Sequence, residues 1–582
     1  MLNGNVGSAS KGSKLITRVQ KMPDRAFRVV IFSMMAPKDI ACLVSRILTE
    51  VPEAMVCGVL YETRREKGLR ERIALWLRGV GDPTYLAYYA ERIWGGVLQA
   101  LRNIGDILLR FWHACPRSPN GQTRFDLEEL AHFLEKEQGS LFVTADLHSL
   151  ESLQFVRSLR ADLGLVYGTR ILKPGLFNIP LQGSVNIHKR KVPDYRGGGP
   201  IGLWELLAGE SEIGVTVHRV DVKLDAGAVI NSANIPIEPF DNLISLALKA
   251  DVVGNDLIVK SVADFARGAA REKPQGEGGR VFRNPKVPKL RAYKKQIAAK
   301  RQAYRAARGW PLSKLALRVI LFAPLVIARN WLRRLRGRFP VVILYHHLVS
   351  DKPHPMGIST DALLRQVEFL RRHYKITSLR EAMEMLKSGR VNAPTVVLTF
   401  DDGYDENFVN LRSITEKTGI PVTLFVCSGH IATGTEFEHD VKQNLRGYPP
   451  LSLEHLVSLS CNGFEFGGHT RFHFDCGSSD RKKLIAEIVG CQSDLEKYLG
   501  RPVNVFSFPW GLPKNMSAEA VDLARATYRH IFSAYGGVNF PSDTNTFWHL
   551  QRCPHSSDSF ELELQIQSIL NLKTPKPMHL QE

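Results

Sequence analysis

The chain has 582 residues, which is too many for one hydrophobic core and predicts two large domains or several smaller ones. Its 44% of hydrophobic and 23% of charged residues exclude a mainly disordered or fibrous protein. Eight cysteines without a CxxC pair argue against a disulfide framework and a structural zinc knuckle. The first 25 residues lack the apolar stretch of a secretory signal, so we expect a protein of the reducing cytoplasm.

The net charge of +19 is confined to one segment. Residues 267–338 hold 21 basic and 2 acidic residues, whereas residues 1–266 have a net charge of +3 and residues 339–582 of −3. A basic scaffold that binds nucleic acid is one reading of this charge. Because the flanking regions are nearly neutral, we favour a basic linker between two domains, and an anionic membrane surface or lipid-linked substrate as its partner.

The pattern of apolar runs after a polar tail, residues 1–26, predicts an α/β domain over residues 27–266. Residues 28–33 and 55–60 read as buried strands on either side of a helix at 39–50, which is a β-α-β opening. Residues 83–113 read as helical and aromatic-rich, and we expect them to cover the sheet or to contact a membrane or partner. Further strands are expected at 141–144, 163–167 and 215–220.

The linker, residues 267–338, begins with glycines and prolines and continues as a basic helix. Residues 310–338 then form a second helix whose apolar part, Leu315–Ala328, contains Arg318 and Pro324. A bilayer span needs roughly 20 apolar residues without a central charge, so this helix suits a membrane surface better than a transmembrane position. We expect peripheral contact with the inner face of a membrane through 310–338, or docking of this helix on either domain.

A second α/β pattern occupies residues 339–571 and is followed by a tail at 572–582. Buried strands are expected at 341–345, 395–400, 422–426 and 505–508, separated by segments long enough for helices. This alternation predicts a β/α barrel or a doubly wound sheet.

Three polar residues in the first domain indicate acyl transfer to an amine. Asn186 and His188 are two positions apart, so on a strand their side chains share one face, and Asp225 stands two residues before Gly227 at the end of a later strand. In this arrangement Asn186 would stabilise an oxyanion, His188 would take the amine proton and Asp225 would orient the imidazole. Taken alone, the spacing is weak evidence for this chemistry and better fits a turn asparagine and a structural histidine.

The surrounding motifs resemble the formyltransferase family. They are GLVYGTRILKPGLFNIP (164–180), NIH (186–188), the later GVTVH (214–218) and LDAG (224–227). The resemblance implies a Rossmann-like domain that transfers a formyl group from 10-formyltetrahydrofolate through Asn186, His188 and Asp225. Lys189, Arg190 and Lys191 stand where the family usually has Ser-Leu-Leu, so we expect an anionic amine carrier such as an amino sugar linked to a nucleotide.

In the second domain, carboxylates and histidines indicate a metal-dependent hydrolase. The strand at 395–400 runs into Asp401 and Asp402, and His469 and His473 have the i,i+4 spacing that places two imidazoles on one face of a helical turn. Two histidines and one carboxylate leave open positions on Zn²⁺ or a similar divalent metal. We expect Asp402 to be the metal ligand and Asp401 the base.

Together with TFDDGY (399–404), HTRFH (469–473) and FSFPWG (506–511), these residues resemble the polysaccharide deacetylase family. The resemblance implies a distorted (β/α) barrel, a metal held by Asp402, His469 and His473, and Asp401 as base. It also implies a substrate groove, for which we name Tyr404, Pro509, Trp510 and Gly511. We assign the general acid to His555, with His549 as the alternative.

The two sites together predict a bifunctional enzyme that formylates an amine, in our reading an amino sugar, and removes an N-acyl group from a glycan or glycolipid. One alternative keeps the deacetylase active and makes the first domain a non-catalytic recognition module. Another is the nucleic-acid-binding scaffold, which the two intact sets of site residues disfavour.

Overall fold

The computed structural model describes residues 14–15, 26–63, 105–114, 126–283, 285, 287–303, 311–541, 547–570 and 578. The chain forms two compact units. Unit 1 consists of Met1–Ile93 and Thr123–Ala299, and unit 2 of Trp94–Gln122 and Lys300–Glu582. Most of the predicted helical segment 83–113 lies outside the described residues, and its last part, from residue 105, belongs to unit 2.

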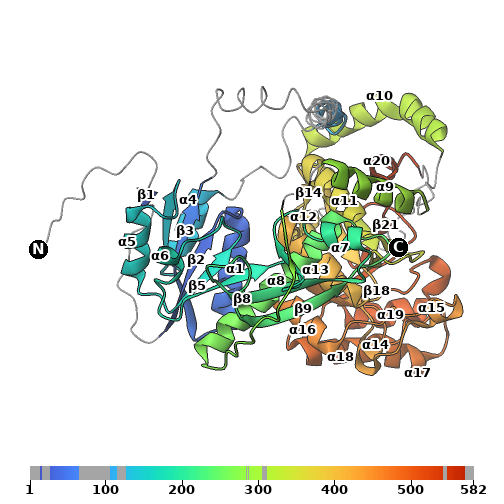
Figure 1. Cartoon of the computed structure of the whole chain (residues 1–582). Helices are drawn as coiled ribbons and strands as arrows, with labels where there is room; N and C mark the ends of the chain where they lie inside the picture. Colours follow the sequence, from blue (N-terminus) through green and yellow to red (C-terminus); the bar gives the residue numbers. More distant parts are fainter. Residues whose placement is uncertain are drawn as a thin grey trace, which may run out of the picture. The chain divides into compact units, whose positions relative to one another are not determined.

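Unit 1 is built on one sheet of eight strands in the order β1-β4-β3-β2-β5-β6-β8-β9 (Figure 1). The strands from β4 to β6 are parallel, whereas β8 and β9 are added as an antiparallel pair. The predicted strands of this half are confirmed. The bounds are β1 Lys14–Leu15, β2 Phe27–Ser33, β3 Ala54–Glu62, β4 Ser140–Thr144, β5 Leu163–Tyr167, β6 Ser184–His188, β8 Glu212–Arg219 and β9 Val229–Pro236.

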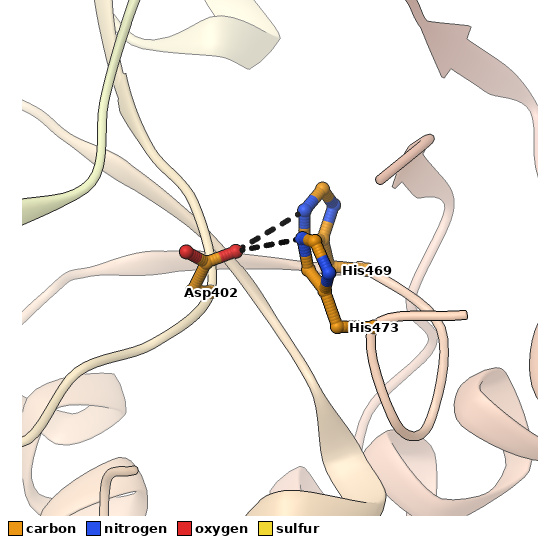
Figure 2. Close-up of side chains that lie close together, drawn as sticks. All are labelled: Asp402, His469 and His473. Carbon is orange, nitrogen blue, oxygen red and sulfur yellow. Dashed lines mark ion pairs between the residues drawn. The ribbon is translucent and has the colours of Figure 1, made fainter. Parts of the chain in front are cut away.

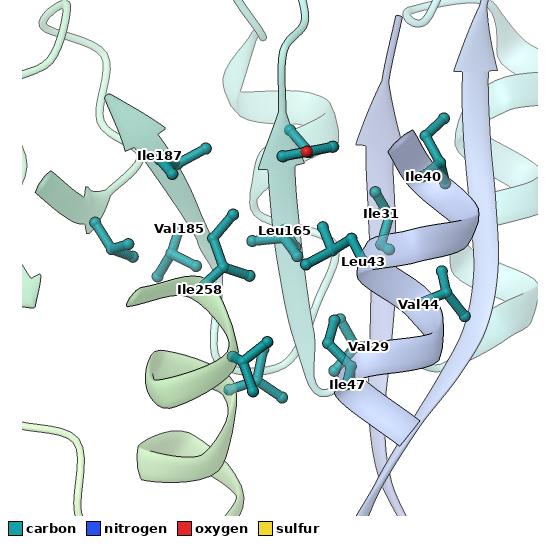
Figure 3. Close-up of a cluster of buried hydrophobic side chains, with 14 of the residues drawn as sticks. Val29, Ile31, Ile40, Leu43, Val44, Ile47, Leu165, Val185, Ile187 and Ile258 are labelled. Atoms are coloured by element: carbon teal, nitrogen blue, oxygen red, sulfur yellow. The ribbon is translucent and has the colours of Figure 1, made fainter. Parts of the chain in front are cut away.

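Helices cover both faces of this sheet because successive strand residues point to opposite sides. On β2, Val29 and Ile31 join one buried cluster with α1, α4 and α8, as Figure 3 shows for α1 and part of the sheet. Val30 and Phe32 join a second cluster with α5 and α6. This two-sided burial confirms a Rossmann-like fold. The helices are α1 Pro37–Glu50, α4 Leu127–Lys136, α5 Leu150–Leu159, α6 Pro174–Phe177, α7 Leu203–Ala208 and α8 Leu243–Ala266.

Unit 2 is a β/α barrel. Its parallel strands follow the order β20-β19-β18-β17-β16-β15-β11-β21, with β14 also paired to β15. The terminal strands β20 and β21 are separated in the chain only by Gln551, so the chain itself joins the two ends of the sheet. The strands are β11 Val341–His346, β14 Lys375–Ile376, β15 Thr395–Phe400, β16 Thr423–Val426, β17 Glu465–Gly468, β18 Val505–Ser507, β19 His530–Phe532, β20 His549–Leu550 and β21 Arg552–Pro554.

Helices of several lengths follow the barrel strands, as expected for alternating strands and helices. A short pair of strands, β12 Leu348–Val349 and β13 Gly357–Ile358, lies outside the barrel sheet. The helices are α11 Thr360–His373, α12 Leu379–Lys387, α13 Glu406–Thr418, α14 Ser428–Thr433, α15 Glu438–Lys442, α16 Leu453–Cys461, α17 Arg481–Leu484, α18 Gly490–Leu499, α19 Ala518–Thr527 and α20 Ser559–Ile566, with a π-helix at Ile485–Val489 and a 3₁₀ helix at Pro513–Asn515.

The basic linker contains the two predicted helices. A short strand, β10 (Arg280–Phe282), pairs in parallel with β7 (Tyr195–Gly197) of unit 1 and precedes α9 (Val287–Ala303). The second helix, α10 (Leu312–Arg336), belongs to unit 2. Among the described residues, its part Ser313–Arg336 is the one helix that is long and apolar enough to cross a membrane.

A buried polar network attaches residues 105–114 to the barrel unit. The Glu563 carboxylate on α20 accepts hydrogen bonds from Trp112 Nε1 at 3.0 Å and Tyr374 Oη at 2.6 Å, and His113 Nε2 lies 2.8 Å from it. Each of these side chains is buried. Because a buried polar group without a partner costs free energy, one carboxylate stabilises three separate segments of unit 2.

We expect the Glu563→Ala substitution to destabilise unit 2 by about 3 kcal/mol, since it leaves buried donors without an acceptor. Glu563→Gln keeps one acceptor oxygen and should cost less. Chemical denaturation measures both changes, and hydrogen exchange should show faster exchange in residues 105–114. Glu561→Ala on the same helix is the control, for which we expect less than about 0.5 kcal/mol. Equal stability of the Glu563 and Glu561 variants would contradict the assigned role.

Candidate active sites

The carboxyl ends of the barrel strands bring Asp402, His469 and His473 together (Figure 2). Asp402 Oδ1 lies 3.4 Å from His469 Nε2 and 3.3 Å from His473 Nε2. The three potential ligand atoms all lie within 4.8 Å of one another. One carboxylate oxygen and two imidazole nitrogens form a donor set that suits Zn²⁺ and similar divalent metals.

The local structure of the two histidines differs from the prediction of a helical turn. His469 directly follows β17, and the chain then turns through Thr470 and His473, whose φ angles are +61° and +53°. These left-handed residues reverse the chain within four residues, so both rings face Asp402 without a helix. The i,i+4 spacing correctly indicated that the two imidazoles lie side by side, but the backbone between them is not helical.

The state of these side chains fits a bound cation. Both oxygens of Asp402 are buried and lack a hydrogen-bond partner, which is costly for an anion unless another charge compensates it. His469 Nδ1 lies 2.7 Å from the Ser507 carbonyl oxygen and must donate to it, so its Nε2 offers a lone pair towards Asp402. Burial alone would raise the pKa of Asp402, but the imidazoles of His473 and His469 hold that pKa well below its ordinary value.

Asp401, the neighbouring carboxylate, is held by an arginine that the sequence did not reveal as a site residue. Arg552 on β21 is fully buried and donates to Asp401 Oδ1 at 2.6 Å and to Oδ2 at 2.8 Å. It also donates to Ser507 Oγ at 2.6 Å. Burial would raise the pKa of Asp401, but the guanidinium outweighs it and keeps that pKa below its ordinary value. Asp401 is therefore a fixed anion.

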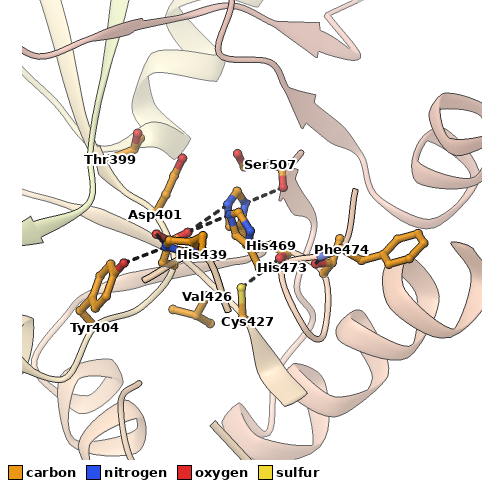
Figure 4. Close-up of polar contacts among 12 residues, drawn as sticks. Thr399, Asp401, Tyr404, Val426, Cys427, His439, His469, His473, Phe474 and Ser507 are labelled. Atoms are coloured by element: carbon orange, nitrogen blue, oxygen red, sulfur yellow. Dashed lines mark hydrogen bonds and ion pairs between the residues drawn. The ribbon is translucent and has the colours of Figure 1, made fainter. Parts of the chain in front are cut away.

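Two further histidines that the sequence analysis did not select face the cluster. His347, after β11, is half-buried, and its charge affects the pKa values of Asp401 and Asp402. His439 on α15 has its Nε2 3.8 Å from Asp402 Oδ2 and 3.0 Å from Tyr404 Oη (Figure 4). His347 follows the predicted strand at 341–345, near the strand end where barrel enzymes collect catalytic groups, whereas no pattern in the sequence marks His439.

The predicted groove residues divide into buried and exposed ones. The Tyr404 side chain is fully buried and its hydroxyl donates to Asp440 at 2.8 Å. A substrate cannot reach this side chain, so Tyr404 does not line a groove. Trp510 is 48% exposed, lies between Pro509 and Gly511, and meets the His473 ring edge-on with the centroids 4.4 Å apart. Of the predicted groove set, Trp510 has the side chain that a substrate can reach beside the cluster.

The two candidate general acids lie in different surroundings. The His555 ring is stacked on His346 with centroids 4.4 Å apart, and its Nδ1 is enclosed without a hydrogen-bond partner. Burial and the neighbouring charges of His346 and His347 hold the pKa of His555 well below its ordinary value. His549 is fully buried and its Nε2 lies 2.9 Å from Ser533 Oγ. His549 is therefore fixed in the barrel wall.

In unit 1 the structure brings the three predicted residues together at the end of β6. Asn186 and His188 lie on the same side of this strand, and Asp225 lies in the turn between β8 and β9 with Oδ2 3.6 Å from His188 Nδ1. The backbone N–H of Gly197 donates to the same Asp225 oxygen at 2.9 Å. A second histidine, His218 on β8, lies opposite Asn186 and 3.3 Å from its Nδ2. Only the antiparallel register reveals that His218 joins the site.

Hydrogen bonds fix the protonation pattern of His188. Its Nε2 lies 2.8 Å from the Tyr195 carbonyl oxygen and must donate to it, which leaves Nδ1 as the basic atom facing Asp225. Burial lowers the pKa of His188, although Asp225 opposes this shift. Asp225 itself would be neutralised by burial, but His218, His188 and Gly197 keep its pKa below the ordinary value. A neutral imidazole therefore faces a carboxylate that can stabilise its protonated form.

The three cations after His188 are paired within the domain. Lys189 binds Asp251, and Lys191 Nζ lies 3.2 Å from Glu212 Oε1. Arg190 is buried and donates to both oxygens of Glu205 at 3.1 and 2.9 Å. The expectation that all three cations face an anionic acceptor is wrong for Arg190, because its charge is neutralised inside the protein.

Comparisons with known proteins match each unit to a different family. A formyl transferase family model matches residues 117–262, and a polysaccharide deacetylase family model matches residues 388–528. The chain is 36% identical to the methionyl-tRNA formyltransferase of Nostoc over 134 residues, which is 23% of the chain and 39% of that protein. It is 32% identical to that of Thermodesulfovibrio yellowstonii over 161 residues, or 27% of the chain and 51% of that protein. The chain thus spans two fifths to one half of these relatives.

Solved structures of a deacetylase and of a formyltransferase are each similar to part of the chain. The Streptococcus pyogenes deacetylase PplD has a TM-score of 0.34 and 21% identity, covering 39% of this chain and 98% of that one. The phosphoribosylglycinamide formyltransferase of Bacillus halodurans has a TM-score of 0.27 and 16% identity, covering 41% and 94%. The matches to the two family models show that the chain contains a formyl transferase domain and a polysaccharide deacetylase domain.

Proposed function

We propose that the chain is a bifunctional enzyme whose second domain removes an N-acyl group from a glycan or glycolipid with the help of a divalent metal. The observation that carries this proposal is the buried Asp402 carboxylate, unpartnered and facing two imidazole nitrogens. A Zn²⁺ or similar ion held by Asp402, His469 and His473 would polarise the acyl carbonyl and lower the pKa of a water. The acyl group can be formyl or acetyl.

The residues around that position supply the proton transfers. Asp401 would take the proton of the attacking water, because Arg552 keeps the carboxylate anionic and correctly oriented. The leaving amine needs a proton, for which His555 and His347 are the two candidates. His347 is favoured because its charge acts on both aspartates and its side chain is only half-buried, whereas the His555 ring is stacked on His346 and its Nδ1 is enclosed.

For the metal, we expect Asp402→Asn to lower hydrolysis of an N-acetylglucosamine oligomer at least about a hundredfold, because a charged ligand is lost. The variant should also retain less metal after dialysis, measured by mass spectrometry of bound metal. Asp405→Asn, three residues away, serves as the control and should keep both properties. If the Asp402→Asn variant kept the metal content of the wild type, this ligand assignment would be refuted.

For the general acid, we expect His347→Ala to lower kcat at least about a hundredfold while the metal content stays unchanged. His555→Ala should have the smaller effect and act through the position of His346. To test the role, kcat is measured for an amide substrate and for the corresponding ester. The alcohol of an ester leaves more readily without a proton than an amine does, so loss of the general acid should lower kcat more for the amide. Loss of amide hydrolysis only in His555→Ala would instead assign the acid to His555.

We further propose that the first domain transfers a formyl group from 10-formyltetrahydrofolate to an amine, most simply that of an amino sugar. Asn186 would donate to the carbonyl oxygen of the formyl group, and His188 Nδ1 would accept the amine proton beside Asp225. A cavity of about 740 Å³ lies along β7, whose Tyr195 carbonyl binds His188. Its walls include Tyr195, Trp204 and Phe282, rings on which a sugar or base could stack.

For formyl transfer, we expect His188→Ala to abolish formylation of an amino-sugar nucleotide and to leave hydrolysis by the other domain unchanged. Because the neutral imidazole is the base and burial lowers its pKa, the rate should stay constant near neutral pH and fall only below the ordinary pKa of 6.5. Asp225→Asn should shift this acid limb to still lower pH and reduce kcat, since the carboxylate raises the pKa of His188. Asparagine tolerates the φ of +50° at this position.

The matched control is Asp221→Asn, an exposed residue of the same loop, which should leave the pH profile unchanged. Equal formylation by the wild type and His188→Ala would refute the assignment of His188 as the base. Absence of formylation by the wild type would support a non-catalytic recognition role for this domain. Because the formyl donor is cytoplasmic, we place both domains on that side of the membrane.

A further inference from the structure

Helix α10 has its apolar face turned outward. The exposed positions include Ile320 at 73%, Leu325 at 66% and Leu335 at 80%. They recur every three or four residues, so they form one stripe along the helix. Between Ala316 and Arg334 no charged side chain is exposed, and Arg334 lies near the end of the stripe, 5.8 Å from the centroid of the Trp331 ring. The exposed apolar residues are Ala316, Leu317, Ile320, Leu321, Pro324, Leu325, Ala328, Trp331, Leu332 and Leu335.

The central cations of the same helix are turned towards the protein. Arg318 donates to the carbonyl oxygens of Ile569 and Leu570, and Arg329 donates to the carbonyl oxygen of Gln567 at 3.0 Å. Arg333 lies over the Phe540 ring, 5.2 Å from its centroid, and burial lowers its pKa to about 9. A helix of a water-soluble surface normally shows the reverse arrangement, with cations outward and leucines inward.

Residues 105–114 extend this apolar surface. Ile107, Leu108 and Phe111 are 63%, 66% and 57% exposed, and the Phe111 ring meets the Trp331 ring edge-on at 6.3 Å. The opposite side of the segment is buried, with Trp112 in the same core cluster as Leu315 and Val326 of α10. Two segments far apart in the sequence therefore present their apolar faces on one surface, which we call the platform.

The packing of α10 argues against a transmembrane position. Leu315, Val326 and Asn330 are buried, and Asn330 donates to the Trp112 carbonyl oxygen and to Gln567 Oε1, both at 3.0 Å. To span a bilayer, the helix would lose these bonds and expose three arginines to hydrocarbon. As docked, only one side of the helix is available to lipid, which is the geometry of an interfacial helix.

We propose that the platform lies in the interface of an anionic lipid bilayer. Helix α10 contains no acidic residue, and its stripe is bordered by exposed cations, Lys314 at one end and Arg336 at the other. The apolar stripe would enter the boundary of headgroups and acyl chains, while these cations meet anionic headgroups. The barrel domain would thereby be held at the membrane surface independently of which acyl group it removes.

The test is co-sedimentation of the full-length protein with vesicles of phosphatidylcholine alone or mixed with phosphatidylglycerol. We expect binding to be stronger with phosphatidylglycerol, and Leu321→Glu/Leu325→Glu to lower the partition coefficient at least about tenfold. Lys314→Gln/Arg336→Gln should weaken binding only to the anionic vesicles. The matched control is Leu453→Glu/Val457→Glu on α16, two apolar residues 45% and 40% exposed, which should bind like the wild type.

Thermal unfolding and hydrolysis of a soluble substrate establish that each variant is folded. Absence of binding by the wild type, or unchanged binding by Leu321→Glu/Leu325→Glu, would overturn the proposal. A wild-type dimer that becomes a monomer in the Leu321→Glu/Leu325→Glu variant, with no vesicle binding by either, would show that a second copy covers the platform. Resistance of the membrane-bound protein to alkaline extraction would show that α10 spans, which also contradicts the proposal. None of these outcomes depends on formyl transfer or on the metal.

Discussion

The ion pair between Arg552 and Asp401 is the interaction on which the deacetylase site depends. The two residues are 151 positions apart and meet because β21 returns to β11 and joins the ends of the sheet. A buried carboxylate and guanidinium at 2.6 to 2.8 Å satisfy each other, whereas either alone would be strongly destabilised. Closure of the barrel thus fixes the proposed base as an anion before substrate or metal arrives.

Among the described residues, Asp402, unlike Asp401, is not paired with an arginine. It follows Asp401 directly, but a φ of +68° turns its side chain away from Arg552 and towards two imidazoles. One aspartate therefore receives a permanent cation of the protein, and the other retains unpartnered oxygens that suit an exchangeable one. Adjacent residues of the same type acquire different chemistry from their surroundings, as is usual for paired carboxylates in active sites.

The formyl transferase domain uses a different constraint. Its parallel sheet ends in the antiparallel strands β8 and β9, and the turn between them carries Asp225 to the end of β6. There the Gly197 N–H and two histidines surround the carboxylate. Both domains therefore place a carboxylate beside imidazoles at strand ends, although their sheets reach this arrangement by unrelated connections.

The sequence by itself determined the strands, because long buried runs such as 395–400 admit few alternatives. It also identified the residues that the structure brings together at the two candidate sites, because their motifs are short and local. It also located the excess charge in the linker. Only the tertiary structure decided that Arg552, His218 and His439 join the sites, that Tyr404 is buried, and that Arg190 is neutralised by Glu205. It likewise decided which face of α10 points outward. The physical reason is that these outcomes depend on pairing register, barrel closure and docking, which join residues far apart in the chain, whereas sequence patterns report only what neighbours along the chain impose.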